Sequence, residues 1–573
     1  MGTYDLVIRG GTVADGTGGD LFEADIAVSG GKIAEIGKVA GKGTEEIDAR
    51  GLLVTPGFVD IHTHYDGQAT WSADLSPSSN HGVTTAVMGN CGVGFAPCRR
   101  EDHDRLIRLM EGVEDIPAPV LAEGLKWNWE SFPDYLGALE ALPHNIDFAA
   151  QLPHGALRVY VMGERGANRE PATPDDIAAM AAIAKDAVSA GAIGFSTSRT
   201  LNHRTSDGSP TPTLTAEEDE LVGIAMGLKA AGCGVLQVVS DFADPAREFS
   251  MLRKMVEQSG RPLSLSLAQN EKAPEGWRFL LSQIEAASNE GLPMKAQVCG
   301  RPVGVLLGLE LTLNPFSAHP SFKEIASLPL AAKVEKMRDP AFKEKLLKEE
   351  PATDNPFMRS VLAHLHKMYA LDRVPDYEPD PETSIGARAK ARGLEPLALA
   401  YDLMLEDDGK AMLYFPFLNY AQNSLEPSYQ MMLHKDTVLG LGDGGAHVGM
   451  ICDGSFSTHM LTHWTRDRKR GERLPLSFVV KAHTQDTARA VGLLDRGILK
   501  PGYKADLNVI DYQGLSLFRP EVAFDLPAGG RRLVQRAKGY KATIVSGEVI
   551  ARDDEGTGAV PGKLLRGAQP APA

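Results

Sequence analysis

Two histidines separated by one residue, His62 and His64, end an apolar stretch near the start of the chain. The stretch reads Thr55-Pro-Gly-Phe-Val-Asp-Ile-His-Thr-His-Tyr-Asp66. Side chains alternate between the two faces of a strand, so this spacing presents both imidazoles on one face. Neutral imidazole is a common ligand of transition metals. The pair therefore predicts half of a metal site at the carboxyl end of a buried strand.

Two further candidate ligands follow other apolar stretches. Cys91 lies in Met88-Gly-Asn-Cys-Gly-Val-Gly94, and Asp443 lies in Val438-Leu-Gly-Leu-Gly-Asp-Gly-Gly-Ala-His447. A buried cysteine alone is usually structural, but a thiolate beside two imidazoles is a metal ligand. A carboxylate there can bind the metal and accept a proton from water. We therefore predict a metal site with Asp443 as its catalytic residue; its ligands are His62, His64, Cys91 and Asp443.

Several basic residues follow strand-like stretches and are candidates for contact with a substrate. His154 and Arg158 follow one stretch, Arg199 follows the next, and His447 lies just beyond Asp443. An arginine can bind a substrate carboxylate through its two parallel N–H donors. For His154 and Arg158 a purely structural role fits the sequence equally well. The segment 202–204, Asn-His-Arg, offers the same chemistry from a longer loop.

The elements that must position these residues alternate between strand-like and helical stretches. Helical patterns such as 174–190 and 216–231 separate several of the apolar runs. Such alternation predicts parallel strands joined by helices, and eight strands predict an α/β fold with a (β/α)8 TIM-like barrel. The eight predicted strands are 58–64, 84–91, 146–152, 192–197, 234–240, 262–268, 294–298 and 438–443.

The two ends of the chain have a different pattern, with short strands punctuated by paired glycines. We expect both ends to build one small β-sandwich domain, from residues 1–57 and 486–573, with a flexible tail after about residue 553. The barrel then spans residues 58–485. The alternation of strands and helices is interrupted at about 301–398, where sequence rich in proline, lysine and glutamate predicts a lid-like insertion.

Composition narrows the class of protein. The chain has 573 residues and a net charge of −16, which disfavours a nucleic-acid partner. Its five cysteines show no disulfide or CxxC pattern, and no leader or apolar stretch long enough to cross a membrane is evident. We expect a cytoplasmic protein with a small-molecule substrate and no membrane partner, and leave open whether it forms a homo-oligomer.

Taken together, the motifs around His62, Cys91, His154, Phe195 and Asp443 resemble the amidohydrolase superfamily, and within it the D-aminoacylase (N-acyl-D-amino-acid deacylase) branch. The resemblance implies a (β/α)8 barrel with a β-sandwich, zinc, and amide hydrolysis by metal-activated water. By position, His62 and His64 match the paired ligands of the first strand. Cys91 matches the cysteine ligand of this branch, and Asp443 the catalytic aspartate.

The chain departs from the family pattern on three strands. The family has a metal-binding histidine at the ends of strands five and six, yet the corresponding positions lie near Val239 and Leu267. The fourth strand, 193–198, has no lysine that could bridge two metals. We therefore expect one Zn²⁺, or another divalent metal, per chain, unless the site is weak or lost.

Three hypotheses about function remain. The first is a metal-dependent amidohydrolase of a linear amide such as an N-acyl-D-amino acid. The second keeps the chemistry but changes the substrate to a cyclic amide, an ester or a carbamate. The third is a metal-free barrel that acts as a binding scaffold. The missing histidines favour this hypothesis, and the four retained candidate ligands argue against it.

Overall fold

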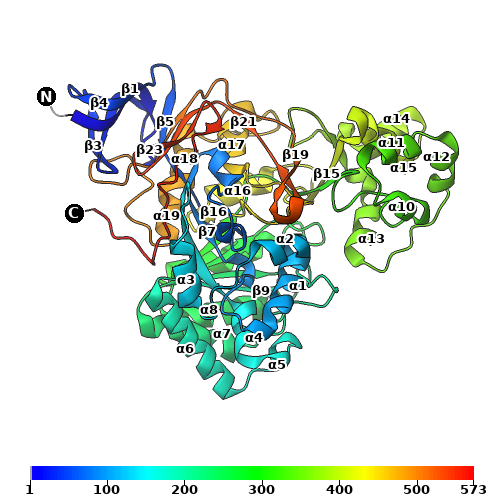
Figure 1. The fold of residues 1–573 in the computed structure, drawn as a ribbon, viewed down its shortest axis with the longest axis horizontal. Coiled ribbons are helices and arrows are strands. Elements are labelled where there is room, and N and C mark those ends of the chain that lie inside the picture. Colours follow the sequence, from blue (N-terminus) through cyan, green and yellow to red (C-terminus); the bar gives the residue numbers. More distant parts are fainter. Residues whose placement is uncertain (1–2, 573) are drawn as a thin grey trace.

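An eight-stranded parallel sheet organises the middle of the chain in the computed structural model, which describes residues 3–572 (Figure 1). The order of the strands in the sheet follows their order in the sequence, and each lies within or beside a predicted run. The strands are β6 (Phe58–Asp60), β7 (Val83–Met88), β8 (Asp147–Pro153), β9 (Gly194–Arg199), β10 (Val235–Ser240), β11 (Leu263–Leu267), β12 (Met294–Val298) and β16 (Thr437–Leu439).

The two edges of this sheet meet just beyond β6 and β16. The amide of His64 donates to the carbonyl of Gly444 (2.8 Å), and the amide of Asp443 donates to the carbonyl of His62 (2.9 Å). Thr63 and Gly444 form a parallel bridge between the same segments. The fold is therefore mixed α/β with a curled parallel sheet, as in a TIM-like barrel.

The strands alternate between a polar interior and an apolar exterior. On β10, Leu236 and Val238 are buried in the apolar core, whereas the side chain of Gln237 between them accepts a hydrogen bond from the amide of Cys91. Because neighbouring residues of a strand face opposite sides, Gln237 points into the barrel and the two apolar residues point toward the helices. Polar residues on these strands therefore mark the interior.

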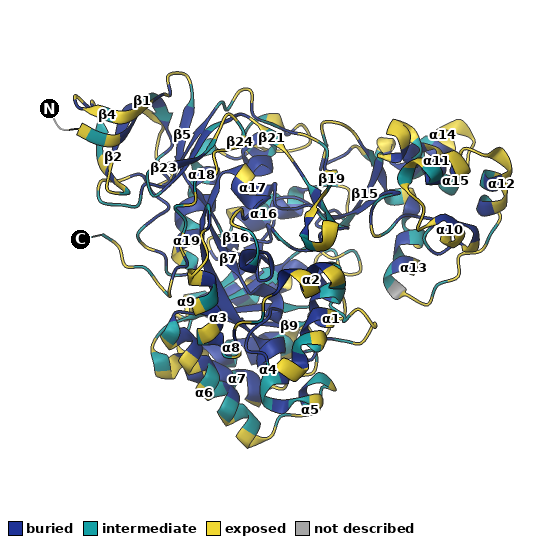
Figure 2. Ribbon diagram, in the orientation of Figure 1, coloured by how far each residue is buried: buried dark blue, intermediate teal, exposed yellow. Residues whose placement is uncertain are grey.

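Helices cover the outside of the sheet and expose their far faces (Figure 2). The longest, α6, begins with a capping box in which Thr173 and Asp176 satisfy each other's backbone amides. The covering helices are α1 (His103–Glu114), α2 (Ala118–Gly124), α3 (Phe132–Glu140), α4 (His154–Met162), α5 (Glu164–Ala167), α6 (Pro174–Ala190), α7 (Glu218–Ala231), α8 (Pro245–Ser259), α9 (Gly276–Asn289), α16 (Glu426–Leu433), α17 (Phe456–His459), α18 (Leu476–Lys481) and α19 (Thr487–Ala490). None of the helices within residues 3–572 is both long and apolar enough to cross a bilayer.

Both ends of the chain contribute to a nine-stranded sheet beside the barrel. The two parts join where Val54 of β5 pairs with Val509 of β17 in antiparallel register. The strands are β1 (Thr3–Val13), β2 (Phe22–Ser29), β3 (Lys32–Gly37), β4 (Lys42–Asp48), β5 (Leu53–Pro56), β17 (Leu507–Ile510), β22 (Tyr540–Val545), β23 (Glu548–Arg552) and β24 (Glu555–Gly556). Two short pairs precede β22: β18 (Ser516–Leu517) with β21 (Ala537–Lys538), and β19 (Glu521–Leu526) with β20 (Gly530–Val534).

The segment between β12 and β16 forms a subdomain with an apolar core of its own, at the right of Figure 1. Its sheet has the order β13 (Val303–Leu307), β15 (Met412–Leu418), β14 (Tyr369–Leu371). Its helices are α10 (Pro320–Ile325), α11 (Leu330–Met337), α12 (Pro340–Leu347), α13 (Pro356–Ala363), α14 (Ile385–Arg392) and α15 (Pro396–Met404). Since β15 is part of this sheet, the subdomain continues past the predicted end near residue 398.

The last residues are held against the barrel rather than forming the flexible tail that the sequence predicted. The amide of Phe148 donates to the carbonyl of Lys563 (3.1 Å), and the amide of Leu565 donates back to the carbonyl of Phe148 (2.7 Å). Leu564 and Leu565 are buried. Composition alone missed this segment because its order comes from pairing with β8, which is distant in sequence.

Candidate metal centre

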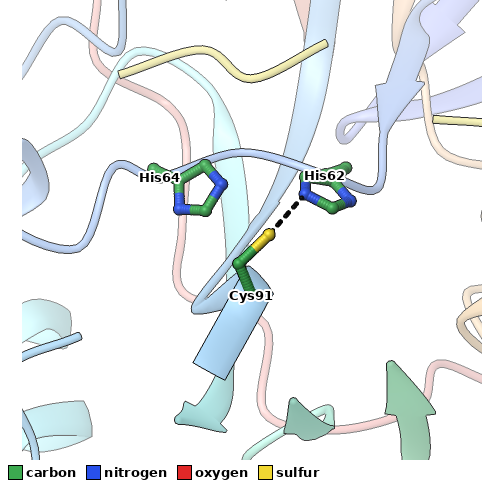
Figure 3. Close-up of side chains that lie close together, drawn as sticks. All are labelled: His62, His64 and Cys91. Carbon is green, nitrogen blue, oxygen red and sulfur yellow. Dashed lines mark hydrogen bonds between the residues drawn. The ribbon is translucent and has the colours of Figure 1, made fainter. Parts of the chain in front are cut away.

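Four side chains converge at the carboxyl ends of β6, β7 and β16. His62 and His64 follow β6 on one extended segment, and Cys91 lies in the turn after β7 (Figure 3). Asp443 follows β16. His62 Nε2 lies 3.3 Å from Cys91 Sγ and 3.4 Å from Asp443 Oδ1. His64 Nε2 lies 3.7 Å from the same carboxylate oxygen. We refer to these four residues as the ligand cluster.

The ligand cluster has the dimensions and chemistry of a zinc site. Bonds of 2.0–2.3 Å in a tetrahedron place neighbouring ligand atoms about 3.3–3.8 Å apart, and the three distances above fall in this range. Ligand atoms of His62, His64 and Cys91 all lie within 4.8 Å of one another, and the three side chains are buried. Two imidazoles, a thiolate and a carboxylate are donors that zinc accepts. The residues present therefore fit one such ion.

Unusual backbone conformations aim two of the ligands. Cys91 has a φ of 55° and Asp443 a φ of 49°, values that non-glycine residues seldom adopt. The turn around Cys91 packs so closely on β9 that a Cβ at Gly92 would lie 2.9 Å from the Cα of Thr197. Strained backbone of this kind gathers at functional sites, where the surrounding structure holds it in place.

Each histidine of the ligand cluster has a buried partner at Nδ1. His62 Nδ1 lies 2.7 Å from Oε1 of Gln297 on β12. His64 Nδ1 lies 3.1 Å from Oε1 of Glu114, at the end of α1. The two groups are close enough for an ion pair, but their geometry is not that of a hydrogen bond. A partner at Nδ1 leaves Nε2 of each ring to face the other ligands, as the outer neighbours of metal-binding histidines do.

The electrostatics of the ligand cluster favour charged groups in a buried place. Burial opposes a charge on His62, but the Cys91 sulfur and Asp443 outweigh it and raise the pKa of the imidazole to about 9. Burial likewise opposes a thiolate, yet the two histidines lower the pKa of Cys91. Against the same effect of burial, hydrogen bonding to His64 and the charge of His62 hold the pKa of Asp443 well below its usual range. A cation would find anionic ligands here.

A model of the amidohydrolase family matches residues 45–551 of this sequence. The chain belongs to the amidohydrolase family. It is similar to two enzymes of Alcaligenes xylosoxydans xylosoxydans over nearly their full length. D-aminoacylase is 26% identical, over 98% of this chain and 97% of the relative; N-acyl-D-aspartate deacylase is 28% identical, over 98% and 95%.

Solved structures of related proteins support this family assignment. A structure of D-aminoacylase with a binuclear metal centre has a TM-score of 0.65 and 25% identity, covering 98% of this chain and all of the other. The N-acyl-D-glutamate deacylase of Bordetella bronchiseptica, complexed with zinc and a phosphonate inhibitor, has the same fold, with a TM-score of 0.64 and 22% identity over 99% and 100% of the chains.

Two of the predicted substrate-binding residues of this amidohydrolase have all their polar groups occupied by protein. His154 is fully buried between Thr197 Oγ1 (2.8 Å) and Glu220 Oε1 (2.9 Å). The guanidinium of Arg158 donates to Glu220 and to backbone carbonyls, and it is also fully buried. The structure therefore favours the structural role that the sequence had left open, because Glu220 on α7 forms an ion pair with Arg158 and a hydrogen bond with His154.

The other two predicted substrate residues differ from each other. Arg199 points both arms of its guanidinium at Glu248 (2.8 and 3.0 Å), so its fork is already filled by a protein carboxylate. His447 lies near the ligand cluster, with Nε2 3.8 Å from the second oxygen of Glu114. Of the four predicted residues, His447 alone retains a place at the site.

The interior positions of strands five and six confirm the departure from the family pattern. Val239 on β10 and Ser266 on β11 face the barrel at this level, because Gln237 and Ser264, two residues earlier, are bonded inside it. Leu267, which the sequence comparison had suggested, instead packs in the outer apolar core. Neither interior residue supplies a nitrogen ligand, so within these strands nothing adds to the ligand cluster.

Sequence reasoning missed Glu114 and Gln297 altogether. Gln297 had no clear signal, since β12 also carries the polar residue Lys295. Glu114 had none either, since it lies at the end of an ordinary amphipathic helix. Both residues owe their role to contacts with segments far away in the sequence.

Proposed function

We propose that this chain is a one-metal amidohydrolase that cleaves the amide bond of N-acyl-D-amino acids. The observation that carries the proposal is the spacing of the ligand cluster, in which Asp443 Oδ1 lies 3.4 Å and 3.7 Å from the two histidines. A carboxylate at that distance can bind the metal through one oxygen and act on water with its other oxygen.

A divalent cation in this pocket would polarise the amide carbonyl and acidify a water molecule. Asp443 is the only carboxylate of the ligand cluster, so it accepts the proton as water adds to the carbonyl carbon. It then passes the proton to the nitrogen as the C–N bond breaks, which yields a carboxylic acid and an amine. The Nδ1 partners, Gln297 and Glu114, keep both imidazoles oriented during these steps.

The preference for the D-amino acid rests on the relatives, which are named as deacylases of D-amino acid derivatives. A panel of matched N-acyl-D- and N-acyl-L-amino acids with acidic, neutral and apolar side chains tests it. We expect hydrolysis of D-substrates only, abolished by a chelator. Turnover restricted to a hydantoin, an ester or a carbamate would replace the proposal, and binding without any turnover would favour the scaffold hypothesis.

The domain boundaries and the role of the insertion remain proposals. The insertion is attached to the barrel at the end that carries the site. The amide of Asn419, just after β15, donates to the carbonyl of Gln269, just after β11 (3.0 Å). The amide of Gln269 donates in return to Asn419 Oδ1 (2.7 Å). This supports a cover for the barrel mouth, and the terminal sheet supports a β-sandwich domain next to a TIM-like barrel. The five free thiols support a cytoplasmic location.

A further inference from the structure

A third imidazole, that of His203, reaches the site from the long loop after β9. The loop is fixed to the neighbouring strand through Asp241, which follows β10. Its carboxylate accepts a hydrogen bond from Thr200 Oγ1 (2.5 Å) and another from the amide of Leu201 (2.7 Å). The carboxyl ends of two adjacent strands therefore determine where His203 lies.

Ser198 of β9 holds the imidazole itself. Its Oγ lies 2.9 Å from His203 Nδ1. Ser196, two residues earlier on the same face of the strand, accepts a hydrogen bond from the amide of Gly92, next to Cys91 (2.9 Å). Ser198 thus faces the barrel interior one level closer to the mouth, and it holds His203 above the turn that carries Cys91.

His203 is bonded to Ser198 near the carboxyl end of β9, at the end of the barrel that carries the ligand cluster. Burial is the main cause that lowers the pKa of its imidazole to about 3, and the charges of His447 and His64 act in the same direction. His203 is therefore a neutral imidazole at neutral pH.

β9 adjoins the turn that carries Cys91 through the hydrogen bond between the amide of Gly92 and Ser196 Oγ, so His203 lies at the same end of the barrel as the ligand cluster. Ser198 pairs with Val239 in register, and Val239 carries no polar side chain. The loop thus adds a polar side chain, that of His203, near Val239, which is an apolar position of the barrel.

We propose that His203 contacts the substrate and donates a hydrogen bond from Nε2 to the amide oxygen as that oxygen gains negative charge during water addition. The proposal rests on the proposed function. In this proposal the hydroxyl of Ser198, 2.9 Å from Nδ1, donates to that nitrogen, and the single ring proton lies on Nε2. One neutral N–H donor suits a developing oxyanion, whereas a substrate carboxylate is better matched by a charged, forked donor.

The test uses His203→Phe, which keeps a ring and removes the donor, and Ser198→Ala, which removes the tether. His366→Phe, at an exposed position of the insertion, is the control. For each zinc-loaded protein, kcat and KM are measured with an N-acyl-D-amino acid, Kd is measured calorimetrically for a phosphonate analogue of the tetrahedral state, and zinc content is determined by elemental analysis.

For His203→Phe we expect kcat and phosphonate affinity to fall about a hundredfold or more, as for loss of one oxyanion donor, with little change in KM or zinc content. Ser198→Ala should lose about tenfold, as for an outer partner. An unchanged kcat would overturn the proposal. So would a rise in KM alone, which indicates carboxylate binding, or a loss of zinc, which indicates a ligand.

The wild-type protein distinguishes the two proposals. If it neither hydrolyses any N-acyl amino acid nor binds the phosphonate, the proposed function fails and the role of His203 fails with it. If the wild type is active and His203→Phe equals His366→Phe in every measurement, the function stands and the role of His203 alone is wrong.

Discussion

The side-chain oxygen of Gln297 lies 2.7 Å from Nδ1 of His62. The amide nitrogen of the same side chain donates to Ser264 Oγ (2.9 Å), so both ends of the amide are held inside the barrel. An oxygen at Nδ1 requires the ring proton to be there, so the lone pair of Nε2 points toward Cys91 and Asp443. A residue of β12 thereby selects the tautomer that can bind a metal.

Gln297→Leu should lower zinc affinity by about 10- to 100-fold, because His62 loses the acceptor that orients it. Gln297→Glu keeps an acceptor at the same position and should retain most of the affinity. Competition with a chelating dye measures both values. Equal affinities for Gln297→Leu and the wild type would show that the orientation of His62 does not depend on this contact.

Purified protein should contain about one zinc per chain, because the ligand cluster supplies one tetrahedral set of donors. Cys91→Ala should lose most of the metal and the activity. Cys98→Ala is the matched control, since Cys98 is buried but its Sγ lies near the carbonyl of Arg99 rather than near the histidines. Elemental analysis decides the matter; two zinc ions per chain in the wild type would contradict the one-metal site.

Asp443→Asn retains the shape of the side chain and removes its basicity. We expect kcat to fall on the order of a hundredfold or more, as losses of a general base do, while zinc content falls less. Steady-state kinetics and elemental analysis on one preparation measure both. A variant with wild-type turnover and its metal in place would assign the base to another residue, with His447 as the next candidate.

Much of this site could be predicted from sequence because the information is local. The strands before His62, Cys91 and Asp443 are recognisable as apolar runs followed by polar residues, with glycines beside Cys91 and Asp443. Since parallel strands present their carboxyl ends at one face, the convergence of these three residues follows from the fold class.

The remainder depends on contacts that a sequence does not display. Arg158 and Arg199 end up paired with Glu220 and Glu248 on the covering helices, and their positions after strands gave no sign of these pairs. Gln297 meets His62 across 235 positions of sequence. In each case a polar side chain binds a partner that is distant in the sequence. The periodicity of the sequence does not predict which partner that is.

Acid should destabilise the fold in part through His81. Its ring is buried between Thr458 Oγ1 and the carbonyl of Gln535, both at 2.9 Å, and burial lowers its pKa from 6.5 to about 4. The unfolded chain takes up a proton at His81 below about pH 6.5, whereas the folded chain does so only near pH 4. Stability from this residue is therefore complete above pH 6.5 and is lost as the pH falls toward 4.

This single group should cost about 2 kcal/mol in the free energy of unfolding between about pH 7 and pH 5. His81→Gln removes the titration, so its overall stability will be lower but should fall less steeply over that interval. Urea unfolding at both pH values measures the two slopes. Equal losses in the wild type and the variant would show that His81 does not contribute to acid sensitivity.

The hydrogen bonds that close the barrel join the same two segments that carry the ligands, His62 with Asp443 and His64 with Gly444. During biosynthesis, His62, His64 and Cys91 leave the ribosome long before Asp443 exists. A nascent or truncated chain that stops short of β16 therefore exposes a thiol and two imidazoles with no fourth ligand and no closed rim. The bonds that close the rim and the carboxylate of the ligand cluster can therefore form only once the chain has been made beyond β16.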